Sequence, residues 1–153
     1  MKFGFLYAVK DINAARAFYE ELFGLTVFED YGEMVSFDCG LVLQQDFDRI
    51  VGMPKADMKV KENNCMICTE QADFDGFVKM LRDRNDITFF EDVKECTWGQ
   101  RVIHFYDLDN HLIEVGESMK TVVNRFLAQG MSEEEAAVRM DIGTDDVRRI
   151  LKE

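Results

Sequence analysis

Two side chains in the second half of the sequence have types and positions suited to acid–base chemistry. His104 lies in a stretch that alternates as a strand does, and Glu114 lies in the otherwise apolar stretch 112–115. A lone carboxylate in an apolar strand needs a bound cation, a hydrogen-bonded partner or a wet pocket. A histidine beside a carboxylate can serve as a general acid or base near neutral pH. His104 and Glu114 are therefore the candidate catalytic pair; the alternative is a pair that is structural or only contacts a ligand.

The turn Asp107-Leu-Asp-Asn-His111 joins these two stretches. A hairpin of residues 101–106 and 112–115 would place His104 and Glu114 on the same face. Arg101 would lie on the opposite face, where a surface salt bridge is favoured over binding of an anionic substrate. His111, in the turn, is expected to be exposed and without a functional role.

The hydrophobic pattern predicts the same order of elements twice, β-α-β-β-β each time. The first set comprises a strand at 3–9, a helix at 12–22 and strands at 26–29, 34–37 and 41–45. The second set comprises a strand at 65–71, a helix at 74–84 and strands at 87–93, 101–106 and 112–115. One such module cannot bury its sheet alone. We therefore expect an α+β fold in which two paired βαβββ modules form a curved eight-stranded mixed sheet with a cleft between them.

The boundaries follow from this repeat. The modules span 2–45 and 64–117, and the linker 46–63 contains the only proline, Pro54. Together they form a domain over 1–118. Residues 119–153 have no strand signal and predict a helical extension with helices at 119–129, after Ser132 and at 144–152.

Composition excludes several classes of partner. The net charge is −12 and the pI is about 4.6, which argues against nucleic acid and against an anionic membrane surface. No apolar run approaches the ~20 residues of a membrane span, and no secretion signal is evident. The four cysteines are expected to be reduced thiols in a cytoplasmic protein, with Cys65 and Cys68 as plain strand residues rather than half of a metal site.

The helical extension admits two interpretations. Residues 127–151 resemble a helix-turn-helix, which would predict a DNA reader. The second helix of that motif would begin with Thr144-Asp-Asp146, whose acidic side chains repel phosphates. A docking or dimerisation appendage is therefore favoured.

The repeat, the segment Trp98-Gly-Gln-Arg101 and the segment Asp107-Leu-Asp-Asn-His-Leu-Ile-Glu114 together resemble the vicinal oxygen chelate superfamily. That group includes glyoxalase I, bleomycin-resistance proteins and extradiol dioxygenases. The resemblance implies a divalent metal bound by one residue from the first strand and one from the last strand of each module. Those positions fall on Gly4, Leu43 or Gln45, Met66 and Glu114. Three of the four expected ligands are lost, and we predict no metal and no cofactor.

The predicted function is binding of a small, partly apolar molecule in the cleft between the modules. The candidate ligand-contacting residues are Gln45, Met66, Trp98, His104 and Glu114. The alternative is a lyase- or isomerase-type enzyme that uses His104 and Glu114, with or without a divalent metal, so that enzymatic activity stays an open question. The resemblance also implies that two copies can pair as a homodimer.

Overall fold

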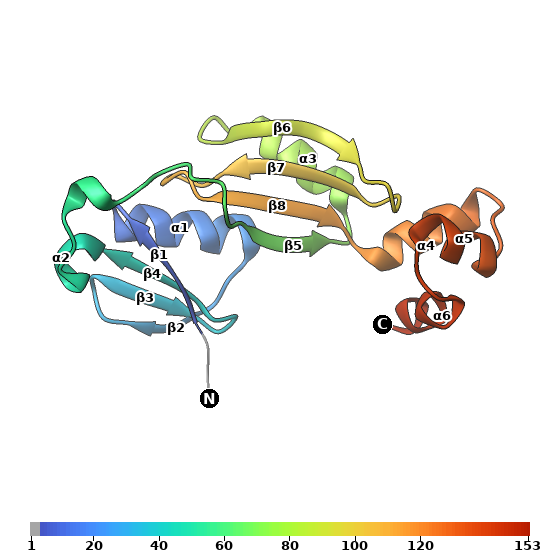
Figure 1. Cartoon of the computed structure of the whole chain (residues 1–153), viewed down its shortest axis with the longest axis horizontal. Helices are drawn as coiled ribbons and strands as arrows, with labels where there is room; N and C mark the ends of the chain where they lie inside the picture. Colours follow the sequence, from blue (N-terminus) through green and yellow to red (C-terminus); the bar gives the residue numbers. More distant parts are fainter. Residues whose placement is uncertain (1–3) are drawn as a thin grey trace. The chain divides into compact units, whose positions relative to one another are not determined.

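Within residues 4–153, which are those that the computed structural model describes, eight strands form two four-stranded sheets (Figure 1). Each sheet belongs to one βαβββ module, and three helices follow the second module. The α+β class, the two modules and the helical extension are therefore confirmed. Phe3, the first residue of the first predicted strand, lies outside the described residues.

The first module has the sheet order β1-β4-β3-β2. Its elements are β1 (Phe5–Val9), α1 (Ile12–Phe23), β2 (Val27–Asp30), β3 (Met34–Phe37) and β4 (Leu41–Gln45). The helix begins where expected, because the Asp11 carboxylate accepts hydrogen bonds from the N–H groups of Asn13 and Ala14. It ends at Gly24, which has the left-handed φ of 65° typical of this position.

The second module repeats this arrangement in the order β5-β8-β7-β6. Its elements are β5 (Ile67–Gln71), α3 (Phe74–Asp83), β6 (Thr88–Glu95), β7 (Arg101–Tyr106) and β8 (Leu112–Glu117). One side of α3 supplies Phe74, Phe77, Val78 and Leu81 to the core. Figure 1 shows α3 against one face of this sheet. The opposite face is the one that carries the candidate pair.

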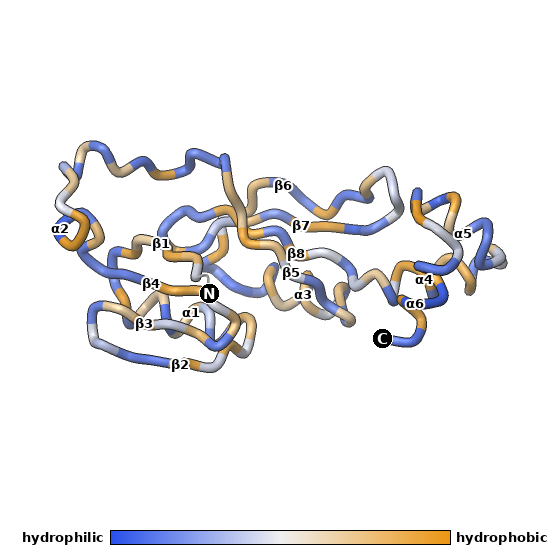
Figure 2. Tube along the Cα trace, turned by 60° about the horizontal axis from the view of Figure 1, so that its bottom comes forward, coloured by the Kyte–Doolittle hydropathy of each residue, from blue (hydrophilic) through white to orange (hydrophobic). Residues whose placement is uncertain are grey.

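The linker has more structure than its sequence predicts. It contains the short helix α2 (Phe47–Val51) and a 3₁₀ turn (Lys55–Asp57). Figure 2 shows that the chain between α2 and β5 is mainly hydrophilic. The 3₁₀ turn lies in this stretch, which lacks the periodic apolar residues by which a helix is recognised, and α2 has five residues, too few for a period to be read.

The C-terminal extension consists of α4 (Met119–Ala128), α5 (Glu133–Met140) and α6 (Thr144–Lys152). These helices share a small core made of Val122, Val123, Phe126, Ala136, Ala137, Met140, Val147 and Ile150. The predicted capping box is present, with Ser132 and Glu135 each bonded to the other's backbone N–H. No helix within residues 4–153 has the length and apolar character needed to span a bilayer.

The described chain divides into two compact units whose boundary does not follow the modules. The turn Tyr106–Leu112 belongs with the first unit, which otherwise extends to Cys65. The second unit contains Met66–Phe105 and Ile113–Glu153. The β7–β8 connection is therefore part of the first unit, although the rest of both strands belongs to the second.

Candidate functional site

The structure brings the two candidate catalytic residues together. His104 Nε2 lies 2.8 Å from Glu114 Oε2, on neighbouring strands of the second sheet. The imidazole is buried, with 9% of its side chain exposed, and the carboxylate is 26% exposed. The carboxylate of Glu114, in the apolar first part of β8, therefore has a hydrogen-bonded partner, which is one of the three reasons expected for it.

A second carboxylate, that of Glu91 in β6, approaches the other nitrogen of the same ring. Glu91 Oε1 lies 2.8 Å from His104 Nδ1, although the buried Nδ1 makes no well-aligned hydrogen bond. Lys94 bonds Glu91 and lowers the pKa of its carboxyl, and His104 adds to this effect. Phe90 packs edge-on against the imidazole, with ring centroids 6.3 Å apart. A protonated ring could offer one N–H to each carboxylate, whereas a neutral ring has only one N–H to offer.

Sequence reasoning missed Glu91. Charged and apolar residues do not alternate cleanly along Thr88–Glu95, so that the sequence does not show which side chains share the face of His104.

The strand pairing shows which residues of the first and last strands lie opposite one another in each module. In the second module β5 and β8 are parallel, and Cys68 lies opposite Glu114. The first module has the same parallel pairing between β1 and β4, in which the equivalent residues are Leu6 and Val42. The first pair of each module is equivalent: Phe5 lies opposite Leu41 in the first, and Ile67 lies opposite Ile113 in the second.

The positions inferred from the sequence lie close to these pairs. Met66 immediately precedes β5 and is 41% exposed, and Gly4 immediately precedes β1. Leu43 is fully buried in the core of the first module. Gly4 and Leu43 have no ligating side chain, and the thioether of Met66 is a soft ligand.

These residues do not fit a chelated divalent metal. Leu6 and Val42 have no donor atoms. Burial and then the charge of Glu114 raise the pKa of the Cys68 thiol, which disfavours the thiolate that binds metals. Glu114 already bonds His104, and Glu91 approaches the opposite nitrogen of that ring, so their carboxylates do not converge. Within residues 4–153 no three histidine, cysteine, aspartate or glutamate side chains form a group that could hold a metal.

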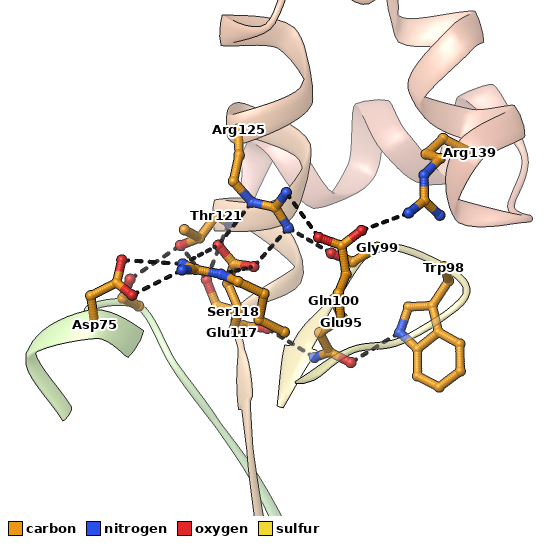
Figure 3. Close-up of polar contacts among 12 residues, drawn as sticks. Asp75, Glu95, Trp98, Gly99, Gln100, Glu117, Ser118, Thr121, Arg125 and Arg139 are labelled. Carbon is orange, nitrogen blue, oxygen red and sulfur yellow. Dashed lines mark hydrogen bonds and ion pairs between the residues drawn. The ribbon is translucent and has the colours of Figure 1, made fainter. Parts of the chain in front are cut away.

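Two of the other candidate ligand-contacting residues have bonds within the protein. Gln45 Oε1 accepts a hydrogen bond from the backbone N–H of Ile12 at 3.0 Å and so holds the start of α1. Trp98 Nε1 donates to Gln100 Oε1 at 3.0 Å, and 41% of the residue remains exposed (Figure 3). The structure thus fixes one edge of the indole and leaves part of its apolar surface accessible.

A buried ion-pair network lies at the end of β8, as Figure 3 shows. The fully buried carboxylate of Glu117 accepts hydrogen bonds from Arg101 and Arg125, with shortest distances of 3.0 Å to each. Burial acts to raise the pKa of Glu117, but the two guanidinium groups outweigh it and the pKa lies below its usual value. Arg101 also bonds Asp75. The salt bridge expected for Arg101 is therefore present with the exposed Asp75, and Arg101 has the buried Glu117 as a second partner.

The other histidine, His111, is not simply exposed as the sequence suggested. Its Nδ1 lies 2.8 Å from Asp107 Oδ2, and 21% of its side chain is exposed. The Asp107 carboxylate also accepts hydrogen bonds from the Tyr19 hydroxyl and from the backbone N–H groups of Asp109 and His111. Burial of the Tyr19 phenol, and then the charge of Asp107, raise its pKa far above the ordinary value, so that the phenol remains a donor.

Comparison with known proteins identifies the family. Residues 3–120 match the glyoxalase-like domain, which shows that the chain belongs to the glyoxalase-like family within the vicinal oxygen chelate superfamily. The match ends at the start of α4, so that most of the helical extension lies beyond it. No curated protein matches the chain.

Solved structures show the same fold. A protein of unknown function from Agrobacterium tumefaciens is 30% identical, with a TM-score of 0.65 over 78% of this chain and 95% of that one. A glyoxalase/bleomycin resistance protein/dioxygenase family enzyme from Burkholderia phytofirmans is 14% identical, with a TM-score of 0.63 over 74% and 94%. A lactoylglutathione lyase from Agrobacterium tumefaciens is 22% identical, with a TM-score of 0.56 over 76% and 92%.

Proposed function

We propose that this glyoxalase-like protein binds a small, partly apolar molecule at the sheet face that carries His104 and Glu114, without a chelated metal. The observation that carries the proposal is that Glu114, the one expected metal ligand with a carboxylate, already bonds His104, while Gly4 and Leu43 have no ligating side chain. Cys68 lies opposite Glu114 on the neighbouring strand, and the raised pKa of its thiol disfavours the thiolate that binds metals.

The surroundings of His104 support this choice of ligand. Phe90 packs against the imidazole and is 52% exposed, so that an apolar surface lies beside a few polar groups. Small-molecule sites commonly combine an apolar lining with a small number of oriented polar groups. Trp98 and Met66 are each 41% exposed and remain candidate contacts.

The enzymatic alternative rests on a different observation, the position of His104 between two carboxylates. A ring with Glu91 at one nitrogen and Glu114 at the other has the groups required for proton transfer to or from a bound substrate. A lyase- or isomerase-type reaction that proceeds by moving a proton would suit this arrangement. Such a reaction would require no metal at the positions where ligating side chains are missing.

Metal content and ligand binding test the proposal together. We expect the purified protein to contain far less than one equivalent of zinc, nickel, manganese or iron by elemental analysis. A thermal-shift screen against metabolites should give stabilising compounds whose effect is unchanged by a chelator, because binding to the folded state raises the melting temperature. One equivalent of metal, with binding that is lost when the metal is removed, would overturn the metal-free site.

The variant His104→Asn locates the compound and separates the two functions. It should weaken binding of a confirmed compound about tenfold, and Lys79→Gln, at an exposed position of α3, is the control. Consumption of the compound by the wild-type protein, followed by NMR and abolished by His104→Asn, would support the enzyme. Binding without consumption would support the binding protein, and equal binding by wild type and His104→Asn would contradict both.

The remaining features of the proposal concern compartment and partners. Cys39, Cys65, Cys68 and Cys96 are all free, which supports a reducing compartment such as the cytoplasm. Arg148 and Arg149 in α6 are bonded to acidic residues of α5 and α6, which supports a function without nucleic acid. Pairing of two copies stays a proposal, and sedimentation velocity would test it.

A further inference from the structure

A cavity in the first unit has no part in the function proposed above. Its volume is about 350 Å³, and it lies between the end of β1, the linker and the turn that joins β7 to β8. This volume is within the range of small-molecule sites. Val9, Met58 and Leu112 contribute apolar surface to its wall.

Backbone strain is concentrated in the wall of this cavity. Among the described residues, five that are not glycine have the left-handed conformation, and four of them line the cavity: Asp46, Lys61, Asn63 and Asn110. A residue with a Cβ adopts this conformation at a cost in free energy, and it persists only where surrounding contacts hold it. Tyr106 holds the linker in place, because its hydroxyl donates to Asn63 Oδ1 at 3.1 Å and its ring lies under Lys61 Nζ. The wall is therefore defined by specific contacts.

His111 brings a fixed imidazole to the cavity with one nitrogen unused. Asp107 holds Nδ1, and the ring packs edge-on against Tyr7 with centroids 4.5 Å apart. Within residues 4–153 no group bonds His111 Nε2, whereas carboxylates approach both nitrogens of His104. An aspartate at Nδ1 fixes the ring so that Nε2 can act on a bound molecule.

Lysines supply positive charge to the same wall. Four line the cavity: Lys10, Lys55, Lys59 and Lys61. Four acidic residues line it as well: Asp46, Asp48, Glu62 and Asp109. Two of these have partners, because Asp46 lies 3.8 Å from Arg49 and Asp109 accepts a hydrogen bond from the Lys10 backbone at 3.0 Å. In the described chain no carboxylate lies within ion-pair distance of Lys59, so that its charge is available to a ligand.

We propose that this cavity binds a small organic anion. The anionic group would contact Lys59 and accept a hydrogen bond from Nε2–H of the protonated His111 ring, and the apolar part of the molecule would pack against Val9, Met58 and Leu112. The proposal is independent of the one for the His104 face, because it uses different residues and a different unit.

The probes are benzoate, protonated benzylamine of similar size and inorganic phosphate, each added to the full-length protein labelled with ¹⁵N. The chain has two histidines, so that their imidazole signals can be followed separately. Benzoate should shift the His111 ring signals in a saturable manner and leave those of His104 in place, and benzylamine should shift neither. If benzoate leaves the His111 signals unchanged, or if phosphate shifts them and benzoate does not, the proposal of an organic-anion site is wrong.

Two variants test the contacts. Lys59→Gln, at an exposed position that should tolerate the change, is expected to raise the Kd of benzoate about fivefold, and His111→Asn about tenfold. Lys79→Gln, an exposed lysine of α3 outside the cavity, is the matched control and should leave the Kd unchanged. Benzoate binding that is equal in Lys59→Gln, Lys79→Gln and the wild type would overturn the assignment to this cavity, even if His111→Asn failed to fold.

Discussion

Arg125 in α4 donates two hydrogen bonds to the carboxylate of Glu117 at the end of β8, at distances of 3.3 and 3.0 Å. Glu117 is fully buried, and Arg101 is its other cationic partner. Because β8 also carries Glu114, this contact joins the helical extension to the strand of the candidate site. The apolar core of the extension consists of its own residues, and this charged pair bonds the extension to β8.

Removing the charge of Glu117 should destabilise the protein. Glu117→Gln leaves two guanidinium groups without their shared buried carboxylate, and we expect the free energy of unfolding to fall by about 2–3 kcal/mol. Urea unfolding followed by circular dichroism measures this. Glu134→Gln, at a position with a 66% exposed side chain, is the control and should cost about 0.5 kcal/mol or less. Equal losses in the two variants would contradict the importance of the buried pair.

The pH dependence of that loss follows from the lowered pKa of Glu117. A carboxylate whose pKa is lower in the folded than in the unfolded protein stabilises the fold above its unfolded value, about 4.3, and loses this effect as the pH falls through the folded value. The stability difference between wild type and Glu117→Gln should therefore be complete at neutral pH and shrink below about pH 4. Unfolding curves recorded across this range test the sign; a difference that grows on acidification would refute it.

Gly99 should not tolerate a side chain, for two separable reasons. Its φ is 88°, and an added Cβ would lie 2.3 Å from Cζ of Phe126 in α4. Gly130 has a similar φ of 92° but open space around its Cβ position. We expect Gly130→Ala to lower the free energy of unfolding by about 1 kcal/mol. Gly99→Ala should cost about 1–3 kcal/mol more because of the contact with Phe126. Similar losses would show that the backbone conformation alone matters.

The hydroxyl of Tyr19 should contribute to stability through Asp107. Their hydrogen bond is 2.8 Å long and buried, and the acceptor is a charged group. Tyr19→Phe is expected to reduce the free energy of unfolding by about 1.5–3 kcal/mol. Tyr31→Phe, at a residue that is 66% exposed, should change it by less than about 0.5 kcal/mol. If Tyr19→Phe leaves the free energy of unfolding unchanged, the Asp107 carboxylate is satisfied without this hydrogen bond.

Local signals in the sequence were sufficient to place most elements. The Asp11 cap and Gly24 define α1, and the Ser132–Glu135 capping box defines the start of α5, because these groups act on backbone atoms a few residues away. The hairpin that pairs His104 with Glu114 was also predictable, since the turn at Asp107 and the alternation on either side are local features.

Contacts between distant parts of the chain were not predictable in this way. The sequence does not show that Cys68 lies opposite Glu114, because a parallel pairing between strands far apart in sequence has no local signal. Glu91 and Arg125 are similar cases, since each meets its partner only after the sheet or the helical extension has formed. These contacts could therefore be predicted only once the strand order and the fold of the helical extension were known.

The assignment of the turn Tyr106–Leu112 to the first unit has a consequence for how this protein could be divided. A gene fragment that ended at the linker would encode the whole first βαβββ module, yet its product would lack Asp107. The Tyr19 hydroxyl would then be left in the interior without its acceptor. Although the two modules repeat the same order of elements, the first module depends on a turn that comes from the second half of the chain, so that it is not complete by itself.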